Sequence, residues 1–191
     1  MSLILGILDS GAAAVAVATF DSIQTVTVGS GGSASISFTS IPSTYSHLQI
    51  RGIARTNRTA YFLDYGKLTF NSDSSSVYTT HHLQGDGASA AAYGEANAAF
   101  TNILRFAADG SPTPSDTFGT FIVDILDYKN TNKNKTIRNL GGCDTNGAGE
   151  LGLYSGVWRN TAAISTITIA PGGGTLFKQY TQFSLYGIKG S

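Results

Sequence analysis

Short runs of alternating apolar and polar residues, broken by turn residues at spacings of about 8–12 residues, constrain the fold of this chain most strongly. Ser35 and Ser37 alternate with Ile36 and Phe38, for example, and Pro42 closes that run. Because successive side chains of a strand point to opposite faces, a period of two predicts half-buried strands. The sequence sustains no helical period of 3.6 residues. The pattern therefore predicts an all-β fold.

Several runs meet the same criteria, and we expect about nine or ten of them to be strands. These runs lie at residues 22–28, 35–38, 47–56, 61–71, 77–84, 100–106, 117–128, 136–140, 151–159, 164–169 and 179–188. In the third run, Leu48, Ile50 and Ile53 are expected to point inward. Jelly roll is the favoured topology, because eight or more strands in two sheets suit a chain of 191 residues. Other sandwich topologies remain open at this point.

Two stretches need separate interpretation. Residues 117–128 are apolar on both faces in places, which favours a central position in a sheet. The alanine-rich stretch 88–99 could form a short helix, but Gly94 and Asn97 favour an irregular loop. The sequence thus predicts one β-sandwich domain over residues 21–191.

Residues 1–20 differ from the rest of the chain. A first apolar run contains Leu3, Ile4, Leu5, Ile7 and Leu8, and a second stretch of small apolar residues covers 12–18. Asp9 follows the first run, which is much shorter than the roughly 20 apolar residues of a membrane-spanning helix. A signal peptide would carry Lys or Arg before the run, and none is present. We therefore expect an extended N-terminal arm that docks on a partner, with a core strand or an atypical signal peptide as alternatives.

The charge balance narrows the function classes. Lys and Arg number 12, Asp and Glu also number 12, and the sequence pI is about 6.8. Without a basic excess, nucleic-acid binding is disfavoured, and no membrane partner is expected. Charged residues make up only 13% of the chain, so the surface is near neutral and suits a protein that assembles with others. Cys143 is the single cysteine, which rules out a disulfide within the chain.

Several segments resemble a group of bacteriophage virion proteins: Phe20–Val28, Ile36–Arg55, Ile164–Pro171 and Phe183–Gly190. The resemblance spans most of residues 20–190 and is strongest at the two ends. Members are usually described as structural or tail-fibre proteins, so the resemblance implies a place in the virion, which is assembled in the host cytoplasm. It supplies no catalytic or ligand motif.

The local motifs do not indicate catalysis or cofactor binding. Residues 147–152 match the dinucleotide pattern G-x-G-x-x-G, but a strand-like segment follows where a helix is required. His81 and His82 are adjacent and would point to opposite faces of a strand, as would Asp124 and Asp127. A glycosidase needs two facing carboxyl groups and a metal needs several converging ligands, so we expect no catalytic residue, cofactor or metal.

Other polar groups are interpreted as structural. Asp64, Asp73 and Asp86 lie near expected loops and match no EF-hand spacing, so we expect solvated carboxylates there rather than a Ca²⁺ site. Cys143 is expected to be a small buried residue. The basic cluster comprises Lys129, Lys133, Lys135 and Arg138 and is expected to serve solubility, with an acidic neighbour in the particle as the alternative.

The sequence therefore predicts a non-enzymatic structural protein of a phage virion. Capsid decoration is favoured slightly, because the chain has no coiled-coil heptads or shaft repeats. The alternative is a tail-fibre or receptor-binding module that recognises host surface glycans, and a glycan-cleaving enzyme ranks third. Expected partners are other copies of the chain and capsid or tail proteins. A homotrimer is expected from the similarity to jelly-roll virion modules.

Overall fold

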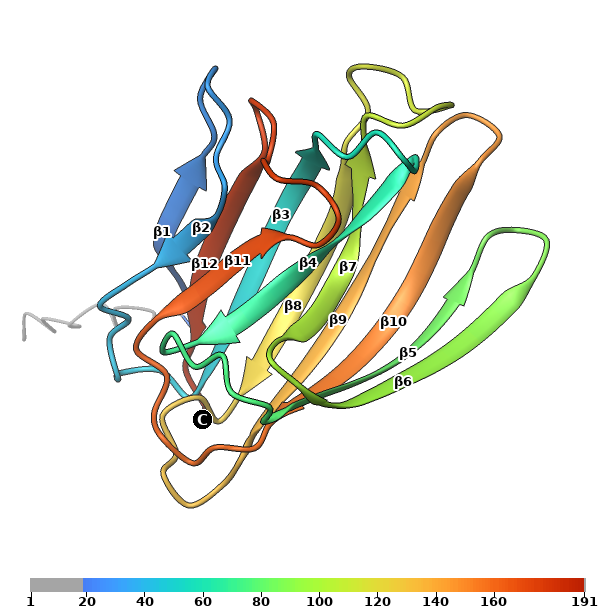
Figure 1. Cartoon of the computed structure of the whole chain (residues 1–191). Coiled ribbons are helices and arrows are strands. Elements are labelled where there is room, and N and C mark those ends of the chain that lie inside the picture. Colours follow the sequence, from blue (N-terminus) through green and yellow to red (C-terminus); the bar gives the residue numbers. More distant parts are fainter. Residues whose placement is uncertain (1–18, 191) are drawn as a thin grey trace, which may run out of the picture.

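The computed structural model describes residues 19–190, which form twelve β-strands and no helix (Figure 1). The strands are β1 Phe20–Thr27, β2 Ile36–Phe38, β3 His47–Thr56, β4 Leu63–Phe70, β5 Tyr78–Gly85, β6 Ala90–Ala98, β7 Thr101–Ala108, β8 Gly119–Leu126, β9 Lys135–Asp144, β10 Gly149–Trp158, β11 Ile167–Pro171 and β12 Gln182–Ile188. The all-β prediction is confirmed. The expected arm residues Leu3, Ile4, Leu5, Ile7 and Leu8 lie outside the described residues.

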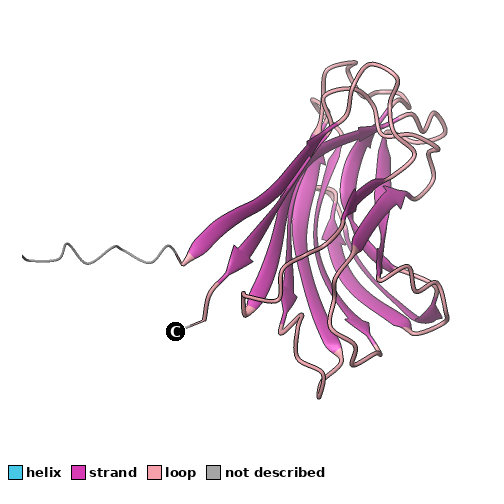
Figure 2. Cartoon of the chain, turned by 90° about the vertical axis from the view of Figure 1, so that its left-hand side faces the viewer, coloured by secondary structure: helices cyan, strands magenta, loops and turns pink. Residues whose placement is uncertain are grey.

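The strands form two layers, which Figure 2 shows from the side. One layer has the order β1-β12-β3-β8-β9-β10-β5-β6 and the other has the order β2-β11-β4-β7. A short parallel pairing of β3 with β7, at Arg55↔Ala107 and Thr56↔Ala108, joins them into one sheet. The other pairings between the described strands are antiparallel.

The path of the chain between the layers is that of a jelly roll. Successive strands from β2 to β8 alternate between the two layers, except that β5 and β6 form a hairpin within one layer. The order β2-β11-β4-β7 then lies opposite β3-β8-β5-β6, which is the order of two interleaved Greek keys. The hairpin of β9 and β10 is inserted between β8 and β5, and β1 and β12 extend the other side of β3.

The core lies between the layers and is rich in phenylalanine. In β8, Phe121 points inward and alternates with outward residues, as the period of two predicts. The ring of Phe106, from the four-stranded layer, lies 5.5 Å from Phe121 and 6.0 Å from Phe183, measured between centroids. Phe177 approaches Phe183 edge-on at 5.2 Å. These tilted and edge-on contacts are the arrangements that aromatic rings prefer, and they join the layers.

The structure corrects the expected orientation of Ile53. Leu48 and Ile50 point inward as predicted, but Ile53 is 40% exposed on the outer face. An odd separation along a strand reverses the face, so Ile53 lies opposite Leu48 and Ile50. Gly52 takes the inward place, where a Cβ would lie 2.5 Å from the ring of Phe183.

The irregular loop expected over residues 88–99 is also wrong, because this stretch is strand β6. It forms a hairpin with β5, and Gly87 turns the chain with a φ of +89°. Backbone pairing to β5 outweighs the helix propensity of alanine. At Gly94 a Cβ would lie 2.8 Å from the imidazole of His81 on the neighbouring strand, so the glycine leaves room for that ring.

Candidate functional site

The two adjacent histidines point to opposite faces of β5, as predicted. His81 is exposed on the outer face, whereas His82 turns inward and lies half-buried in a cleft. The cleft is half-open and has a volume of about 230 Å³. Its lining residues, which define the aromatic cleft from here on, are Tyr65, His82, Glu95, Phe100, Asn102, Arg105 and Tyr154. They come from β4, β5, β6, β7 and β10 and the turn before β7.

Three rings from three neighbouring strands are stacked beside this cleft. His82 lies 4.3 Å from the ring of Tyr154 with an interplanar angle of 10°, and 4.9 Å from the ring of Tyr93 on the other side. The register of β6, β5 and β10 places Tyr93, His82 and Tyr154 directly opposite one another. A row of three neighbouring aromatic rings therefore lies beside the cleft, from the exposed Tyr93 to the buried Tyr154.

The polar groups of the cleft are only partly satisfied. The amide Nδ2 of Asn102 donates to Oε2 of Glu95 at 3.1 Å, and Arg105 donates to Oε1 of Gln84 at 2.6 Å. Arg105 also forms an ion pair with Glu150. In contrast, Nε2 of His82 and Oδ1 of Asn102 are buried atoms without a hydrogen-bond partner among the described residues. Unpaired buried polar atoms are costly, so these two atoms mark a place where a ligand group would be stabilised.

Burial controls ionisation in the cleft. Desolvation, together with the nearby charge of Arg105, lowers the pKa of His82. Burial raises the pKa of Tyr154 to about 12. Since both shifts disfavour the charged form, His82 and Tyr154 are neutral at neutral pH. The cleft thus offers hydrogen bonding and ring contact.

A second feature is a band of exposed apolar side chains on the outer face of the eight-stranded layer. The directly opposed residues Ile122, Leu140, Leu153 and Leu83 form a row across β8, β9, β10 and β5. The apolar band comprises Ile53, Leu83, Ile122, Leu140, Leu151 and Leu153, which are 39% to 62% exposed. Contiguous apolar surface of this kind marks an interaction site.

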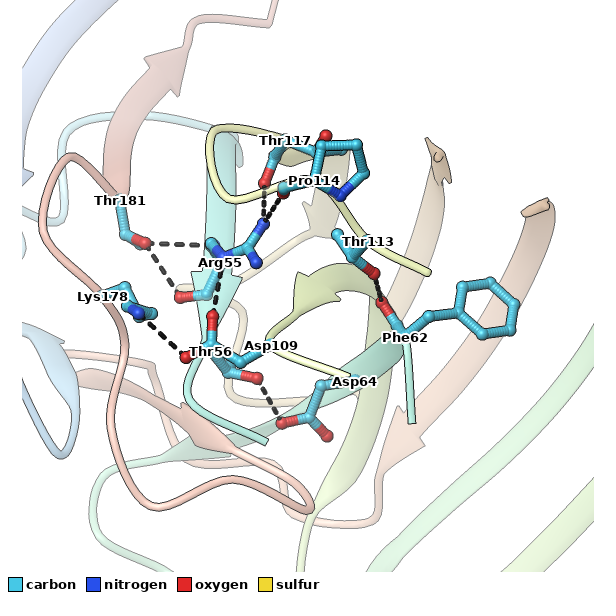
Figure 3. Close-up of polar contacts among 10 residues, drawn as sticks. All are labelled: Arg55, Thr56, Phe62, Asp64, Asp109, Thr113, Pro114, Thr117, Lys178 and Thr181. Atoms are coloured by element: carbon cyan, nitrogen blue, oxygen red, sulfur yellow. Dashed lines mark hydrogen bonds and ion pairs between the residues drawn. The ribbon is translucent and has the colours of Figure 1, made fainter. Parts of the chain in front are cut away.

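A buried polar network lies where β3 meets two long loops (Figure 3). Arg55 is 3% exposed and donates to Oδ1 of Asp109 at 2.9 Å, and to the carbonyl oxygens of Pro114 and Thr117. Lys178 donates to the other oxygen of Asp109 at 2.8 Å. Burial opposes ionisation of Asp109, but the hydrogen bonds from Lys178 and Arg55 outweigh it and lower its pKa. Arg55 and Asp109 have their partners within the chain, which indicates a structural role for the network.

Asp64 is not the solvated loop carboxylate that the sequence suggested. It lies in β4, is fully buried, and accepts hydrogen bonds of 2.8 Å from Thr56, Gly173 and Gly174. Asp73 does lie in a turn, and Asp86 lies in the exposed hairpin turn before β6. Residues 19–190 contain no group of three or more His, Cys, Asp or Glu side chains that could hold a metal ion.

The remaining sequence candidates are dispersed. Asp124 pairs with Arg138 at 2.7 Å, whereas Asp127 pairs with Lys133 at 2.8 Å in the following turn. Cys143 is buried, as predicted, and burial raises its pKa to about 11.

The structure corrects the expectation that Lys135 belongs to a basic cluster on the surface. Lys135 is fully buried and donates to the backbone carbonyls of Asn130, Lys133 and Thr161. Residues 147–152 span the turn between β9 and β10 and the start of β10, so the G-x-G-x-x-G match has no helix after it. No helix in residues 19–190 is long and apolar enough to cross a membrane.

Most residues of the aromatic cleft carry no recognisable sequence signal. His82 stands out beside His81, whereas Glu95, Asn102 and Arg105 belong to no motif. Glu95 lies in β6, whereas Asn102 and Arg105 lie in β7. The site forms only because β7 of the smaller layer faces β10 and β5 of the larger layer. A local motif cannot encode such a site.

No protein-family model and no curated protein matches the chain. Among solved structures, the chain is similar to the CBM2 module of the evolved Dit of Lactobacillus casei BL23 phage J-1. The identity is 15% and the TM-score 0.24, over 82% of this chain and 70% of that chain.

Proposed function

We propose that this protein is a non-enzymatic structural protein of a bacteriophage virion. In this proposal, it is a surface jelly-roll module that associates with copies of itself through the apolar band and is fastened to the particle by its N-terminal arm. Capsid decoration is the favoured role, with capsid proteins as the partners of the arm. The proposal joins the sequence resemblance to virion proteins with the exposed apolar band.

The apolar band is the observation that carries this proposal. Along each strand, the residues of the band alternate with buried core residues, so their outward position follows from the period of two. Burial of apolar surface contributes about 25 cal/mol per Å², so covering six large side chains would stabilise an assembly substantially. Monomeric soluble proteins rarely expose a contiguous apolar surface of this kind.

Localisation in the particle tests the proposal directly. Purified virions of the phage that encodes the chain would be treated with an antibody against residues 20–190 and imaged by electron microscopy. We expect label over the head surface in a fixed number of copies per particle. Label on the tail would support a virion role but contradict decoration. Absence of the protein from purified virions would overturn the proposal.

The second candidate function is a receptor-binding module that recognises host surface glycans. The aromatic cleft favours it, because stacked rings beside unpaired hydrogen-bonding atoms suit a ligand that is both hydroxylated and ring-shaped. Binding of the full chain to an array of bacterial surface polysaccharides would test this function.

Catalysis is no part of either candidate. General acid–base chemistry needs a titratable pair held within hydrogen-bond reach of one substrate atom. Asp124 and Asp127 are each engaged with different cations, and Glu150 is paired with Arg105. Incubation of the protein with bacterial surface glycans should leave their chain length unchanged, and shortened chains would contradict a non-enzymatic role.

A further inference from the structure

We propose that the aromatic cleft binds a single neutral sugar ring, in direct contact with His82 and Asn102. The proposal deepens the receptor-binding candidate and rests on it, since it names both the ligand class and the site. Three observations support it: the open edge of the sandwich at the cleft, the unpaired atoms Nε2 of His82 and Oδ1 of Asn102, and the charge and volume of the cleft.

The cleft exists because the two layers end at different strands. The four-stranded layer ends at β7, whereas the eight-stranded layer continues past β9 through β10, β5 and β6. Within the described residues, no strand of the smaller layer lies beyond β7, so the inner face of the β5–β6 hairpin stays accessible (Figure 1). Tyr93 and Glu95 of β6 lie on this inner face, because they pair with the inward residues His82 and Thr80. The fold therefore presents aromatic and polar groups at an open edge.

The unpaired atoms define what a ligand must offer. Because the carboxylate of Glu95 only accepts hydrogen bonds, the amide nitrogen of Asn102 faces it and leaves Oδ1 as an acceptor without a donor. Nε2 of His82 is the second unpaired atom, and it accepts or donates according to the tautomer. A hydroxyl group can donate to Oδ1 of Asn102 and can serve either tautomer of His82.

The rings of the cleft complete the match with a sugar. Tyr93 is 56% exposed beside His82, and Phe100 and Tyr65 are among the residues that line the cleft. An aromatic face can cover the apolar C–H face of a sugar ring while the hydroxyl groups reach the polar atoms. A purely apolar ligand would leave both unpaired atoms without partners, which disfavours it.

Charge and size restrict the ligand further. Arg105 is neutralised by Glu150, and the ammonium of Lys67 over Phe100 is offset by the carboxylate of Glu95. Because these positive and negative charges balance, the cleft exerts no net electrostatic attraction on an anionic ligand. The volume of about 230 Å³ lies below the roughly 300–1,000 Å³ of sites that enclose drug-sized ligands, so one ring fits and a longer chain would extend into solvent.

Binding of methyl glycosides to the full chain tests the proposal. Saturation-transfer NMR would be recorded with neutral methyl hexosides, methyl 6-deoxyhexosides and methyl N-acetylhexosaminides, and with an anionic uronic acid glycoside for comparison. We expect at least one neutral glycoside to bind. His82→Phe keeps the ring but removes its nitrogens, and Asn102→Leu removes the acceptor. Each should weaken binding at least about tenfold in a chemical-shift titration.

His81→Phe is the matched control, because it makes the same change on the opposite face of the same strand and should leave binding unchanged. Circular dichroism would establish that each variant folds, and having two cleft variants keeps the test valid if one does not. Binding that survives both variants, binding of the anionic glycoside alone, or no binding of any neutral glycoside would overturn the proposal. If the chain binds a polysaccharide array and both cleft variants still bind it, the receptor-binding function stands and only the cleft assignment fails.

Discussion

The indole Nε1 of Trp158 donates a hydrogen bond of 2.8 Å to the carboxylate Oδ2 of Asp73. Trp158 ends β10 and is 1% exposed, whereas Asp73 lies in the turn between β4 and β5. The ring of Trp158 also lies 5.5 Å from Phe70 and 6.3 Å from Tyr78. One turn carboxylate thus satisfies the buried donor of the largest core side chain.

Replacement of that carboxylate should destabilise the domain. In the Asp73→Ala variant the indole N–H is left buried without its partner, and an unsatisfied buried donor costs about 1–3 kcal/mol. Urea denaturation at neutral pH would measure this loss. Asp86→Ala is the control, because Asp86 caps an exposed turn and supports no buried group. Equal losses in the two variants would contradict the role assigned to Trp158.

The same carboxylate should make stability depend on acid. Hydrogen bonds from the side chain and backbone of Ser75, and then from Trp158, lower the pKa of Asp73 to about 2. Folding lowers this pKa, so the ionised carboxylate of Asp73 contributes to the free energy of unfolding. This contribution is fully present above the unfolded value near 3.8 and is lost as the pH falls toward about 2. In Asp73→Asn, the free energy of unfolding should change less between these two pH values than in the unmodified chain. Parallel pH curves for the two proteins would refute this expectation.

The buried network around Arg55 predicts a much larger effect than surface ion pairs do. Arg55→Ala leaves Asp109 with Lys178 alone and removes the guanidinium donor from the carbonyl oxygens of Pro114 and Thr117. Loss of one partner from a buried pair costs about 3–5 kcal/mol.

A surface pair supplies the control for that variant. Arg138→Ala removes a partner of Asp124, but the side chain of Arg138 is 68% exposed, and such pairs contribute about 0–1 kcal/mol. Thermal unfolding of both variants would compare the losses. A small loss for Arg55→Ala would show that the loops are held by other contacts.

The apolar band should control self-association. Leu140→Glu with Leu153→Glu places two charges in the middle of the band without touching the core, because both side chains point outward. If the chain forms the expected trimer, this variant should be a monomer in multi-angle light scattering while the circular dichroism spectrum is preserved. Tyr180→Glu, at an exposed aromatic residue in the loop before β12, should leave the oligomer intact. A variant with both glutamates that remains oligomeric would place the interface elsewhere.

Individual residues show how far the sequence determines the fold and where it does not. The bounds of β3 could be predicted in full and those of β1, β4, β5 and β8 closely, because their alternation is local. The second apolar face of residues 117–128 was attributed to a central position, which β8 does occupy, but Ile122 on that face is exposed. In sequence, a strand with an exposed apolar face therefore resembles a strand that is buried on both faces. Strand β6 depends on hairpin pairing with β5, which the alanine-rich composition of residues 88–99 does not signal. The aromatic cleft depends on the approach of strands from both layers, which no local pattern encodes.

Removal of residues 1–18 should leave a folded domain that no longer attaches to the particle. The described chain begins at Thr19, whose carbonyl accepts a hydrogen bond from Lys189, and β1 pairs with β12 from Phe20 onward. The deletion therefore keeps the contacts among residues 19–190, and we expect the thermal midpoint to stay the same. The apolar residues Leu3, Ile4, Leu5, Ile7 and Leu8 would be lost, and with them the apolar surface that we expect to dock on a virion protein. Co-sedimentation of the truncated and full chains with particles that lack the protein would compare attachment. A chain in which these five residues are replaced by serine separates the loss of apolar side chains from the loss of length, and it should also fail to attach. Unchanged stoichiometry of the truncated chain on the particle would show that the sandwich itself carries the attachment site, and the apolar band would then be the surface to mutate next.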